Sequence, residues 1–253
     1  MTDTVALIVA AGRGHRAGGE LPKQYRLLAG QSLLRRSCTA FLNHPRINAV
    51  GAVIHPDDGK LYNESAAGLE LLPPVHGGAT RQESCRNGLE SLVSLAPERV
   101  LIHDAARPFV DKATIDRVLD ALADGPAAIA GIAVTDTLKK AASNMRIAGT
   151  VQREGLWRAQ TPQGFRYAEI LEAHRKLAAQ SLTDDAAVAE AAGLAVALAP
   201  GNEDNFKLTT EDDFARAERM LGAGDIRVGS GFDVHRFNEG NAVILCGIKI
   251  KFD

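Results

Sequence analysis

Short apolar segments alternate along the chain with longer segments in which apolar residues recur every three or four positions. The apolar segments are rich in β-branched residues and predict buried strands: Val5–Val9, Ala49–Ile54, Val100–Ile102, Ala127–Val134 and Leu194–Ala199. The amphipathic segments predict helices: Leu33–Leu42, Arg81–Leu95, Ala113–Ala123, Tyr167–Ala179, Asp184–Ala192 and Glu211–Leu221. This alternation indicates an α/β fold, with a Rossmann-like, mostly parallel sheet covered by helices on both faces.

Two segments interrupt the alternation. Residues Thr135 to Gly164 are polar with short alternating stretches, and we interpret them as an excursion from the sheet, a β-arm suited to pairing with another subunit. Residues 222–225 begin with Gly-Ala-Gly, which predicts a flexible linker. The expected organisation is therefore a main domain over 1–221, a linker over 222–225 and a different unit over 226–253.

The loop after the first predicted strand carries the strongest chemical signal. Residues 10–25 contain four glycines together with Arg13, Arg16 and Lys23. Glycines let successive backbone N–H groups approach a ligand, and such N–H groups form a concavity for anionic oxygens. The added positive charge predicts a polyphosphate site.

Two familiar phosphate loops fit this segment poorly. A Walker A loop would close with Gly-Lys-Ser/Thr, which is missing here. The spacing Gly12-x-Gly14-x-x-Ala17 fits a relaxed dinucleotide fingerprint, but the interval about 20 residues on holds Gln31, Ser32, Arg35 and Arg36 rather than the acidic residue that binds ribose. A dinucleotide cofactor is thus the weaker interpretation.

Composition narrows the class of protein. The net charge of −2 over 253 residues argues against a general nucleic-acid or membrane-surface binder. Cys38, Cys85 and Cys246 are odd in number and widely spaced, which is typical of free thiols in a reducing compartment. The sequence has neither a secretory signal pattern nor an apolar run of membrane-spanning length, so we expect a cytoplasmic protein.

Polar residues follow several predicted strands, where open α/β sheets bind their ligands. Asp104 ends one strand, and a carboxylate there can hold Mg²⁺ against nucleotide phosphates; a helix or turn cap is the alternative. Residues 77–84, Gly-Gly-Ala-Thr-Arg-Gln-Glu-Ser, suit contact with a base and ribose, and Thr80 with Glu83 also forms a capping-box pattern. Asp204 and Lys207 follow the last predicted strand.

Seven ordered motifs now identify a family resemblance. AAGRGHRAGGELPKQY, GGATRQES, HDAARP, VTDTLK, REGLWRAQTPQGF, LTDDAA and EDNFKLTTEDD occur in this order within residues 5 to 221. Together they closely resemble the 2-C-methyl-D-erythritol 4-phosphate cytidylyltransferases of the non-mevalonate isoprenoid pathway. The resemblance implies a nucleotide-diphospho-sugar transferase type of fold and a homodimer joined by β-arms. It also implies CTP as donor, methylerythritol phosphate as acceptor and Mg²⁺ as cofactor.

The resemblance also assigns roles to matched positions. Arg16 and Lys23 match groups that stabilise charge on the CTP phosphates, and Arg153 and Lys207 match groups that orient the acceptor. Asp104 matches the magnesium-binding carboxylate, which Asp204 is expected to assist. The remaining matches are nucleotide-binding positions (Ala10, Ala11, Gly12, Gly78, Ser84, Ala105 and Arg107) and acceptor-binding positions (Thr137 and Thr161). One departure is Ala79, where many members have an acidic residue, so a side-chain contact to cytidine is not expected there.

The tail carries a second resemblance. Asp233 and His235 lie two positions apart in a segment with strand alternation, so both side chains project from one face. The segment resembles the start of 2-C-methyl-D-erythritol 2,4-cyclodiphosphate synthases, in which Asp-x-His supplies two of three zinc ligands. A third ligand is missing here, so we expect a fragment of a bifunctional protein, weak or no Zn²⁺ binding and no cyclase activity.

Two other functions remain as alternatives. A sugar-1-phosphate nucleotidyltransferase would share the glycine-basic loop but use other nucleotides or acceptors. A nucleotide-binding regulator would bind CTP without turnover, and the basic residues Lys23, Arg153 and Lys207 argue against it. In-line attack on the α-phosphorus of CTP needs no covalent enzyme intermediate, so fixed positive charge and positioning are the chemistry expected of this chain.

Overall fold

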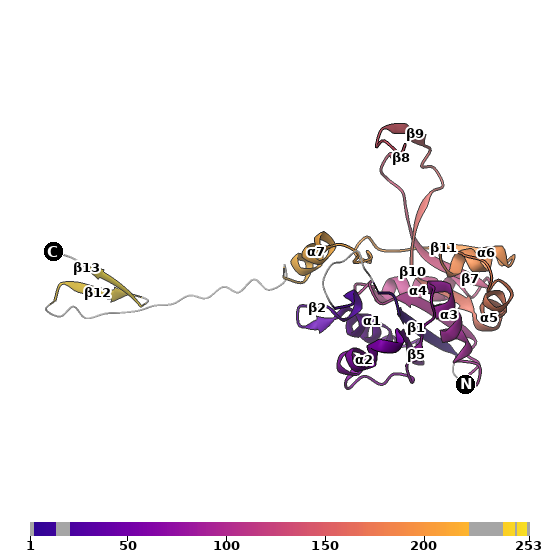
Figure 1. The fold of residues 1–253 in the computed structure, drawn as a ribbon, viewed down its shortest axis with the longest axis horizontal. Coiled ribbons are helices and arrows are strands. Elements are labelled where there is room, and N and C mark those ends of the chain that lie inside the picture. Colours follow the sequence, from indigo (N-terminus) through magenta and orange to yellow (C-terminus); the bar gives the residue numbers. More distant parts are fainter. Residues whose placement is uncertain (1–2, 14–20, 223–239, 246, 252–253) are drawn as a thin grey trace.

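A computed structural model describes residues 3–13, 21–222, 240–245 and 247–251 of the chain. Its centre is a seven-stranded sheet with helices on both faces (Figure 1). In spatial order the strands are β11 (Val196–Pro200), β7 (Ala127–Ala133), β10 (Trp157–Arg166), β6 (Arg99–Asp104), β1 (Thr4–Ala10), β4 (Ala49–Ile54) and β5 (Val75–His76). Strand β10 is antiparallel to both neighbours and every other adjacent pair is parallel, which confirms the mostly parallel sheet.

The sheet is buried on both faces because its strands are apolar at successive positions. In β1, Ala6 and Ile8 enter one hydrophobic core and Val5 and Leu7 enter the other. The helices of the first face are α1 (Leu33–Leu42), α2 (Gly59–Ala66) and α4 (Lys112–Ala121). The helices of the second face are α3 (Arg81–Glu90), α5 (Tyr167–Lys176) and α6 (Asp185–Ala191).

Helix boundaries follow local capping where the sequence supplies a cap. Helix α1 has the predicted bounds, and the Ser32 hydroxyl accepts a hydrogen bond from the Arg35 amide at its start. Helix α3 ends at Glu90, five residues before the predicted end, because the following residues form turns such as the Leu92 N–H to Leu89 carbonyl bond. Helix α2 was not predicted, since Tyr62 is its one buried residue and no apolar stripe marks it.

Strand β10 corrects the interpretation of residues 135–164 as wholly outside the sheet. Residues from Trp157 onward return to the centre of the sheet, between β6 and β7. The strand escaped prediction because Gln160 and Gln163 are polar yet buried. Their amides are satisfied by distant segments: Gln160 donates to the Asn202 carbonyl at 2.8 Å, and Gln163 donates to Asp184 at 2.8 Å.

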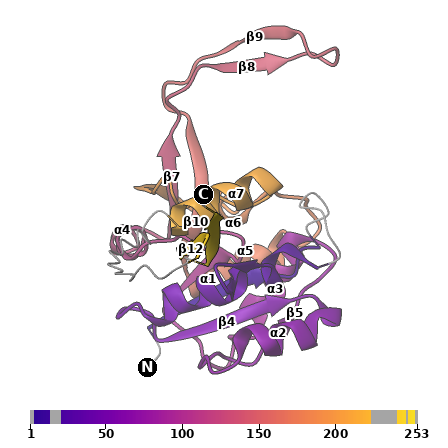
Figure 2. The same ribbon diagram turned by 90° about the vertical axis from the view of Figure 1, so that its left-hand side faces the viewer.

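The first part of the same segment does form an arm. Strands β8 (Leu138–Ala141) and β9 (Ile147–Val151) pair as an antiparallel hairpin in a separate two-stranded sheet. Figures 1 and 2 show this hairpin projecting from the body beyond β7 and β10. Apolar side chains on it are exposed, among them Met145 at 86% and Ile147 at 68%.

Three further elements complete the described structure. Helix α7 (Glu211–Gly222) packs Phe214 against Leu28 and Leu33, beside the small hairpin of β2 (Leu27–Leu28) and β3 (Gln31–Ser32). Strands β12 (Ala242–Leu245) and β13 (Ile248–Lys251) form a hairpin of their own. Within the described residues, no helix combines the length and apolar character needed to cross a bilayer.

Candidate active site

A cavity of about 490 Å³ opens where β1 and β6 end. The two strands are parallel, and Val9 stands opposite Asp104, so both carboxyl ends reach the same edge of the sheet. Several predicted nucleotide-binding residues meet there. The cavity is lined by Val9, Ala10, Ala11, Gly12, Arg13, Lys23, Gln24, His55, Gly78, Ala79, Thr80, Arg81, Ser84, Asp104, Ala105, Ala106 and Lys207.

The glycine-basic loop contributes two cations that the structure describes. Lys23 lies in a short 3₁₀ helix, where its Nζ donates to the Leu208 carbonyl at 3.0 Å. Arg13 lines the cavity, but its guanidinium is ion-paired to Asp57 at 2.8 Å and to Asp58 at 2.9 Å. Arg13 was expected to add positive charge to the phosphate site, and these two carboxylates offset that charge. Arg16 lies outside the described residues.

The loop before α3 forms one wall of the cavity and is tightly hydrogen-bonded. Ser84 accepts from the Gly78 amide at 3.1 Å and donates to the Thr80 carbonyl at 2.8 Å. The capping box is half as predicted: Thr80 accepts from the Glu83 amide, whereas Glu83 reaches back to the amide of Ala79 at 2.8 Å. Ala79 stands where many members of the resembled family have an acidic residue. Its backbone N–H donates instead to the Glu83 carboxylate of α3.

Gly77 is required by close backbone approach. A Cβ at this position would lie 2.4 Å from the Cβ of Ala11 and 2.7 Å from the hydroxyl of Ser84. The loop after β1 and the loop before α3 therefore touch, with Ala11 and Ser84 both packed against Gly77.

Three cationic side chains surround the carboxylate of Asp104 at the cavity. Its Oδ2 accepts from Lys207 Nζ at 2.8 Å, its Oδ1 accepts from Arg81 Nε at 3.4 Å, and Arg107 Nε lies 3.9 Å away. Burial by itself would raise the pKa of Asp104, but these cations hold it well below the ordinary value of a carboxyl group. Asp104 therefore stays ionised and orients Lys207 toward the cavity.

A buried chain of hydrogen bonds supports Asp104 from behind. The Asp104 amide donates to the Thr161 hydroxyl at 3.1 Å, and Thr161 lies 2.9 Å from Nδ1 of His103. The Nε2 of His103 lies 3.0 Å from the Arg107 carbonyl, which can only accept, so Nε2 carries the proton and Nδ1 accepts from Thr161. Burial lowers the pKa of His103 to about 4, so the ring is neutral at pH 7. His103 is therefore a packed residue within the fold.

Of the predicted site residues that the structure describes, five do not line the cavity: Arg107, Thr137, Arg153, Thr161 and Asp204. Thr137 is exposed at the base of the arm, and Arg153 donates to the carbonyl of Thr135 within the same arm. Asp204 is exposed in the loop that leads to Lys207, and no described ion pair or hydrogen bond joins its carboxylate to Asp104. Thr161, by contrast, is buried at 4% exposure and its hydroxyl is engaged by Asp104 and His103.

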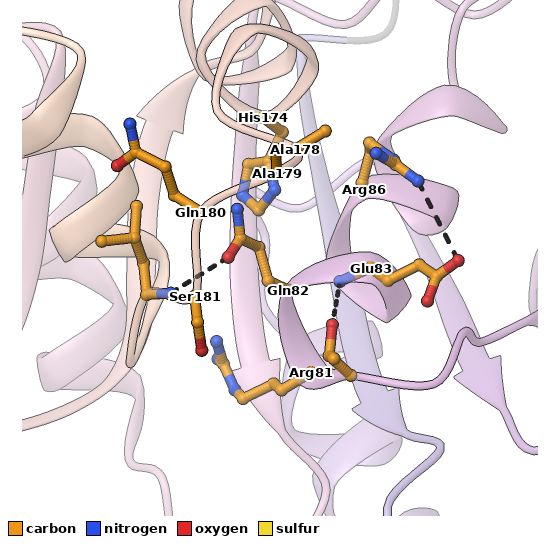
Figure 3. Close-up of a pocket in the computed structure, with 11 residues that line it drawn as sticks. Arg81, Gln82, Glu83, Arg86, His174, Ala178, Ala179, Gln180 and Ser181 are labelled. Atoms are coloured by element: carbon orange, nitrogen blue, oxygen red, sulfur yellow. Dashed lines mark hydrogen bonds and ion pairs between the residues drawn. The ribbon is translucent and has the colours of Figure 1, made fainter.

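Arg81 is the site residue that sequence reasoning left without a role. It lines the main cavity and also a second cavity of about 550 Å³ between α3 and the end of α5 (Figure 3). Its Nη1 lies 2.8 Å from Asp185, while its Nε faces Asp104. The hydrophobic pattern offers no signal for this pairing, because Asp185 follows in sequence by about a hundred residues.

The predicted zinc ligands of the tail, Asp233 and His235, lie outside the described residues. Within the part of the chain that the structure describes, no cluster of three or more His, Cys, Asp or Glu side chains could hold a metal ion. Of the predicted metal ligands that the structure describes, Asp104 lines the main cavity and Asp204 does not.

A mostly parallel sheet with a cavity at the carboxyl ends of its strands, lined by Lys23 and Lys207, matches an α/β fold of the nucleotidyltransferase type. The chain belongs to the 2-C-methyl-D-erythritol 4-phosphate cytidylyltransferase (IspD) family, whose model matches residues 4–223. Two similar solved structures share this fold. One is a 4-diphosphocytidyl-2C-methyl-D-erythritol synthase with 30% identity and a TM-score of 0.76, covering 87% of this chain and 100% of that one. The other is a 2-C-methyl-D-erythritol 4-phosphate cytidylyltransferase from Thermus thermophilus with 32% identity and a TM-score of 0.72, covering 87% and 99%.

Similar curated proteins are longer than this chain. A bifunctional enzyme IspD/IspF from Rhodospirillum rubrum is 60% identical over 252 residues, which cover 99% of this chain and 65% of that protein. A second one, from Paramagnetospirillum magneticum, is 57% identical over 255 residues, which cover 100% and 66%. The chain therefore spans about two thirds of the length of these relatives.

Proposed function

We propose that the chain transfers CMP from CTP to 2-C-methyl-D-erythritol 4-phosphate, giving 4-diphosphocytidyl-2-C-methyl-D-erythritol and pyrophosphate. The observation that carries this proposal is the cavity in which Lys23, Asp104 and Lys207 meet, within the part of the chain that matches the family. Two anionic substrates must approach each other in this reaction, and a cavity with several fixed cations lowers the electrostatic cost of that approach.

The two substrates occupy different sides of the cavity in this proposal. Lys23 and Arg16 bind the triphosphate of CTP and stabilise the charge that develops on its oxygens as pyrophosphate leaves. Gly78 and Ser84, with the loop that follows β1, hold the nucleoside. Lys207 orients the acceptor phosphate, whose oxygen attacks the α-phosphorus in line. The role of the protein is then positioning and charge stabilisation, with no covalent intermediate.

The residues present fit a divalent cation at Asp104. The carboxylate is ionised, lies on the cavity wall and already accepts a cationic ammonium group at 2.8 Å. One carboxylate together with substrate phosphates is the usual mode of Mg²⁺ binding. Bound there, with Asp204 in support, Mg²⁺ would neutralise charge on the nucleotide phosphates.

The arm suggests how the acceptor side is completed. Arg153 and Thr137, the predicted acceptor-binding residues of the arm, lie outside the cavity of their own chain. We propose a homodimer in which the exposed apolar side chains of the β8–β9 hairpin pair with a second copy and bring these residues toward a cavity. Removing residues 138–151 should give a monomer by light scattering; an unchanged dimer would contradict this role of the arm.

The bifunctional relatives suggest a role for the tail. Their similarity extends over 99% of this chain, beyond the cytidylyltransferase match that ends at residue 223. We propose that residues 1–221 form the cytidylyltransferase domain and that residues 226–253 correspond to the start of a cyclodiphosphate synthase domain, joined by 222–225. Zn²⁺ would serve only a complete second domain. The buried thiols of Cys38 and Cys85 support a cytoplasmic location.

Pyrophosphate release tests the proposed reaction. The chain is incubated with Mg²⁺, one nucleotide (CTP, UTP or ATP) and one acceptor (methylerythritol phosphate or a sugar 1-phosphate). We expect release with CTP and methylerythritol phosphate together and little with the other pairs. Preference for UTP or ATP with a sugar phosphate would instead support a sugar-1-phosphate nucleotidyltransferase, and CTP binding without release would support a regulator.

A further inference from the structure

Arg81 is held between two carboxylates that belong to different parts of the fold. Its Nη1 lies 2.8 Å from Oδ2 of Asp185, and its Nε donates to Oδ1 of Asp104 at 3.4 Å. Asp185 starts α6, whereas Asp104 ends β6 in the main cavity. The closer contact of Arg81 is thus with the carboxylate that lies outside the cavity.

Asp185 is itself fixed in place. Its side chain is 1% exposed, and its Oδ1 lies 3.2 Å from Nε2 of the fully buried His174, which faces the second cavity (Figure 3). Burial would raise the pKa of Asp185, but Arg81 and His174 keep it below the ordinary value, so the carboxylate is charged. A buried carboxylate in this position costs free energy unless a cation pairs with it, so it holds Arg81 strongly.

The ion pair between Arg81 and Asp185 determines which cation contacts each carboxylate oxygen of Asp104. Arg81 takes only a long contact to Oδ1, and Oδ2 accepts from Lys207 at 2.8 Å, with Arg107 Nε 3.9 Å away. A guanidinium prefers two parallel hydrogen bonds to one carboxylate when no other acceptor competes. Without the charge of Asp185, Arg81 would turn toward Asp104 and compete with Lys207 for it.

We infer that Asp185 is a positioning residue of the active site, acting through Arg81 and Asp104 on the orientation of Lys207. This inference rests on the proposed function only for the role of Lys207 toward the acceptor phosphate. The relay itself, from Asp185 to Lys207 across two intervening side chains, is a property of the fold and is measurable without substrate.

The neighbouring carboxylate provides a matched control. Asp184 caps α6 by accepting from the Ala187 amide at 2.9 Å and accepts from Gln163 at 2.8 Å, and it has no described contact with Arg81. Asp184→Asn and Asp185→Asn are therefore the same chemical change at adjacent positions. The first loosens a cap, whereas the second removes the charge that holds Arg81.

Steady-state kinetics form the first test. For Asp185→Asn we expect kcat/KM for methylerythritol phosphate to fall about 10- to 100-fold, with the KM for CTP within about twofold of wild type, as for loss of an outer-shell side chain that orients a functional group. Asp184→Asn should keep both values within about twofold. Arg81→Lys, which keeps the charge but cannot span two carboxylates, should reproduce the loss if Asp185→Asn folds poorly. Equal losses in Asp184→Asn and Asp185→Asn, or no loss in Asp185→Asn and Arg81→Lys, would overturn the inference.

A double-mutant cycle on unfolding tests the relay without any reaction. Lys207→Met should be less destabilising in the Asp185→Asn background than in wild type, with a departure from additivity of about fivefold or more in the unfolding equilibrium constant. The cycle of Lys207→Met with Asp184→Asn should be additive. Additivity in both cycles would overturn the relay, whereas absence of pyrophosphate release by the wild-type chain would overturn only the proposed function.

Discussion

The neutral state of His103 makes a quantitative prediction about acid stability. The ring is fully buried between Phe41, the Thr161 hydroxyl and the Arg107 carbonyl, and its pKa in the folded chain is about 4. In the unfolded chain a histidine has a pKa of about 6.5. Between these two values the unfolded chain binds a proton that the folded chain does not, so folding becomes less favourable as the pH falls.

The size of this effect follows from the difference between the two pKa values. Each pKa unit corresponds to about 1.4 kcal/mol, so the free energy of unfolding should fall by about 2 kcal/mol from pH 7 to pH 5. It should fall by about 3 kcal/mol in total by pH 4, and the contribution of His103 changes little below that pH. Both figures refer to His103 alone, so they are measured as a difference between variants.

His103→Asn removes the titrating group and keeps a side-chain acceptor for Thr161. Urea unfolding, followed by circular dichroism at several pH values, gives the free energy of unfolding for each protein. The wild type should be more stable than the variant at pH 7, and this advantage should shrink by about 2 kcal/mol at pH 5. His76→Asn, which removes an exposed imidazole, should follow the wild-type curve. If the free energies of unfolding of the wild type and of His103→Asn differed by the same amount across this pH range, the conclusion that the His103 ring is neutral when buried would be refuted.

Three further predictions concern the proposed active site. Lys23→Ala or Arg16→Ala should lower kcat by about 10²–10³, the cost of losing one positioned charge in a transition state, and near-normal turnover would remove the variant residue from its proposed role. Arg153→Ala should chiefly raise the KM for methylerythritol phosphate, and an effect confined to CTP would contradict it. Gly77→Ala should weaken CTP binding measured by calorimetry, because its Cβ would fall 2.4 Å from that of Ala11; unchanged affinity would show that the two loops can separate.

The strands of the central sheet could be predicted where a buried strand consists of consecutive apolar residues. Residues 5–9, 49–54 and 100–102 read as strands because both of their faces meet helices, and the structure places them side by side as β1, β4 and β6. Strand β10 could not be found in this way. Its buried Gln160 and Gln163 are satisfied by residues from the 202 loop and from α6, and no local pattern reveals such partners.

The candidate site could likewise be predicted only in part. Ala10, Gly12, Gly78 and Asp104 were expected at strand ends, and the topology brings them to one cavity because parallel strands end at the same edge. Arg13 was expected to add positive charge to the phosphate site. It is instead held by Asp57 and Asp58, whose proximity depends on the pairing of β1 with β4.

The sequence by itself determined the α/β class, the family and the identity of the cations available to a phosphate ligand, because these depend on residue types and on their order along the chain. Only the tertiary structure decided how those charges are paired. Asp104 receives Lys207 from a loop about a hundred residues later, and Arg81 contacts both Asp104 and the distant Asp185. Electrostatic interactions depend on distance in space and on burial, and neither is set by separation along the sequence.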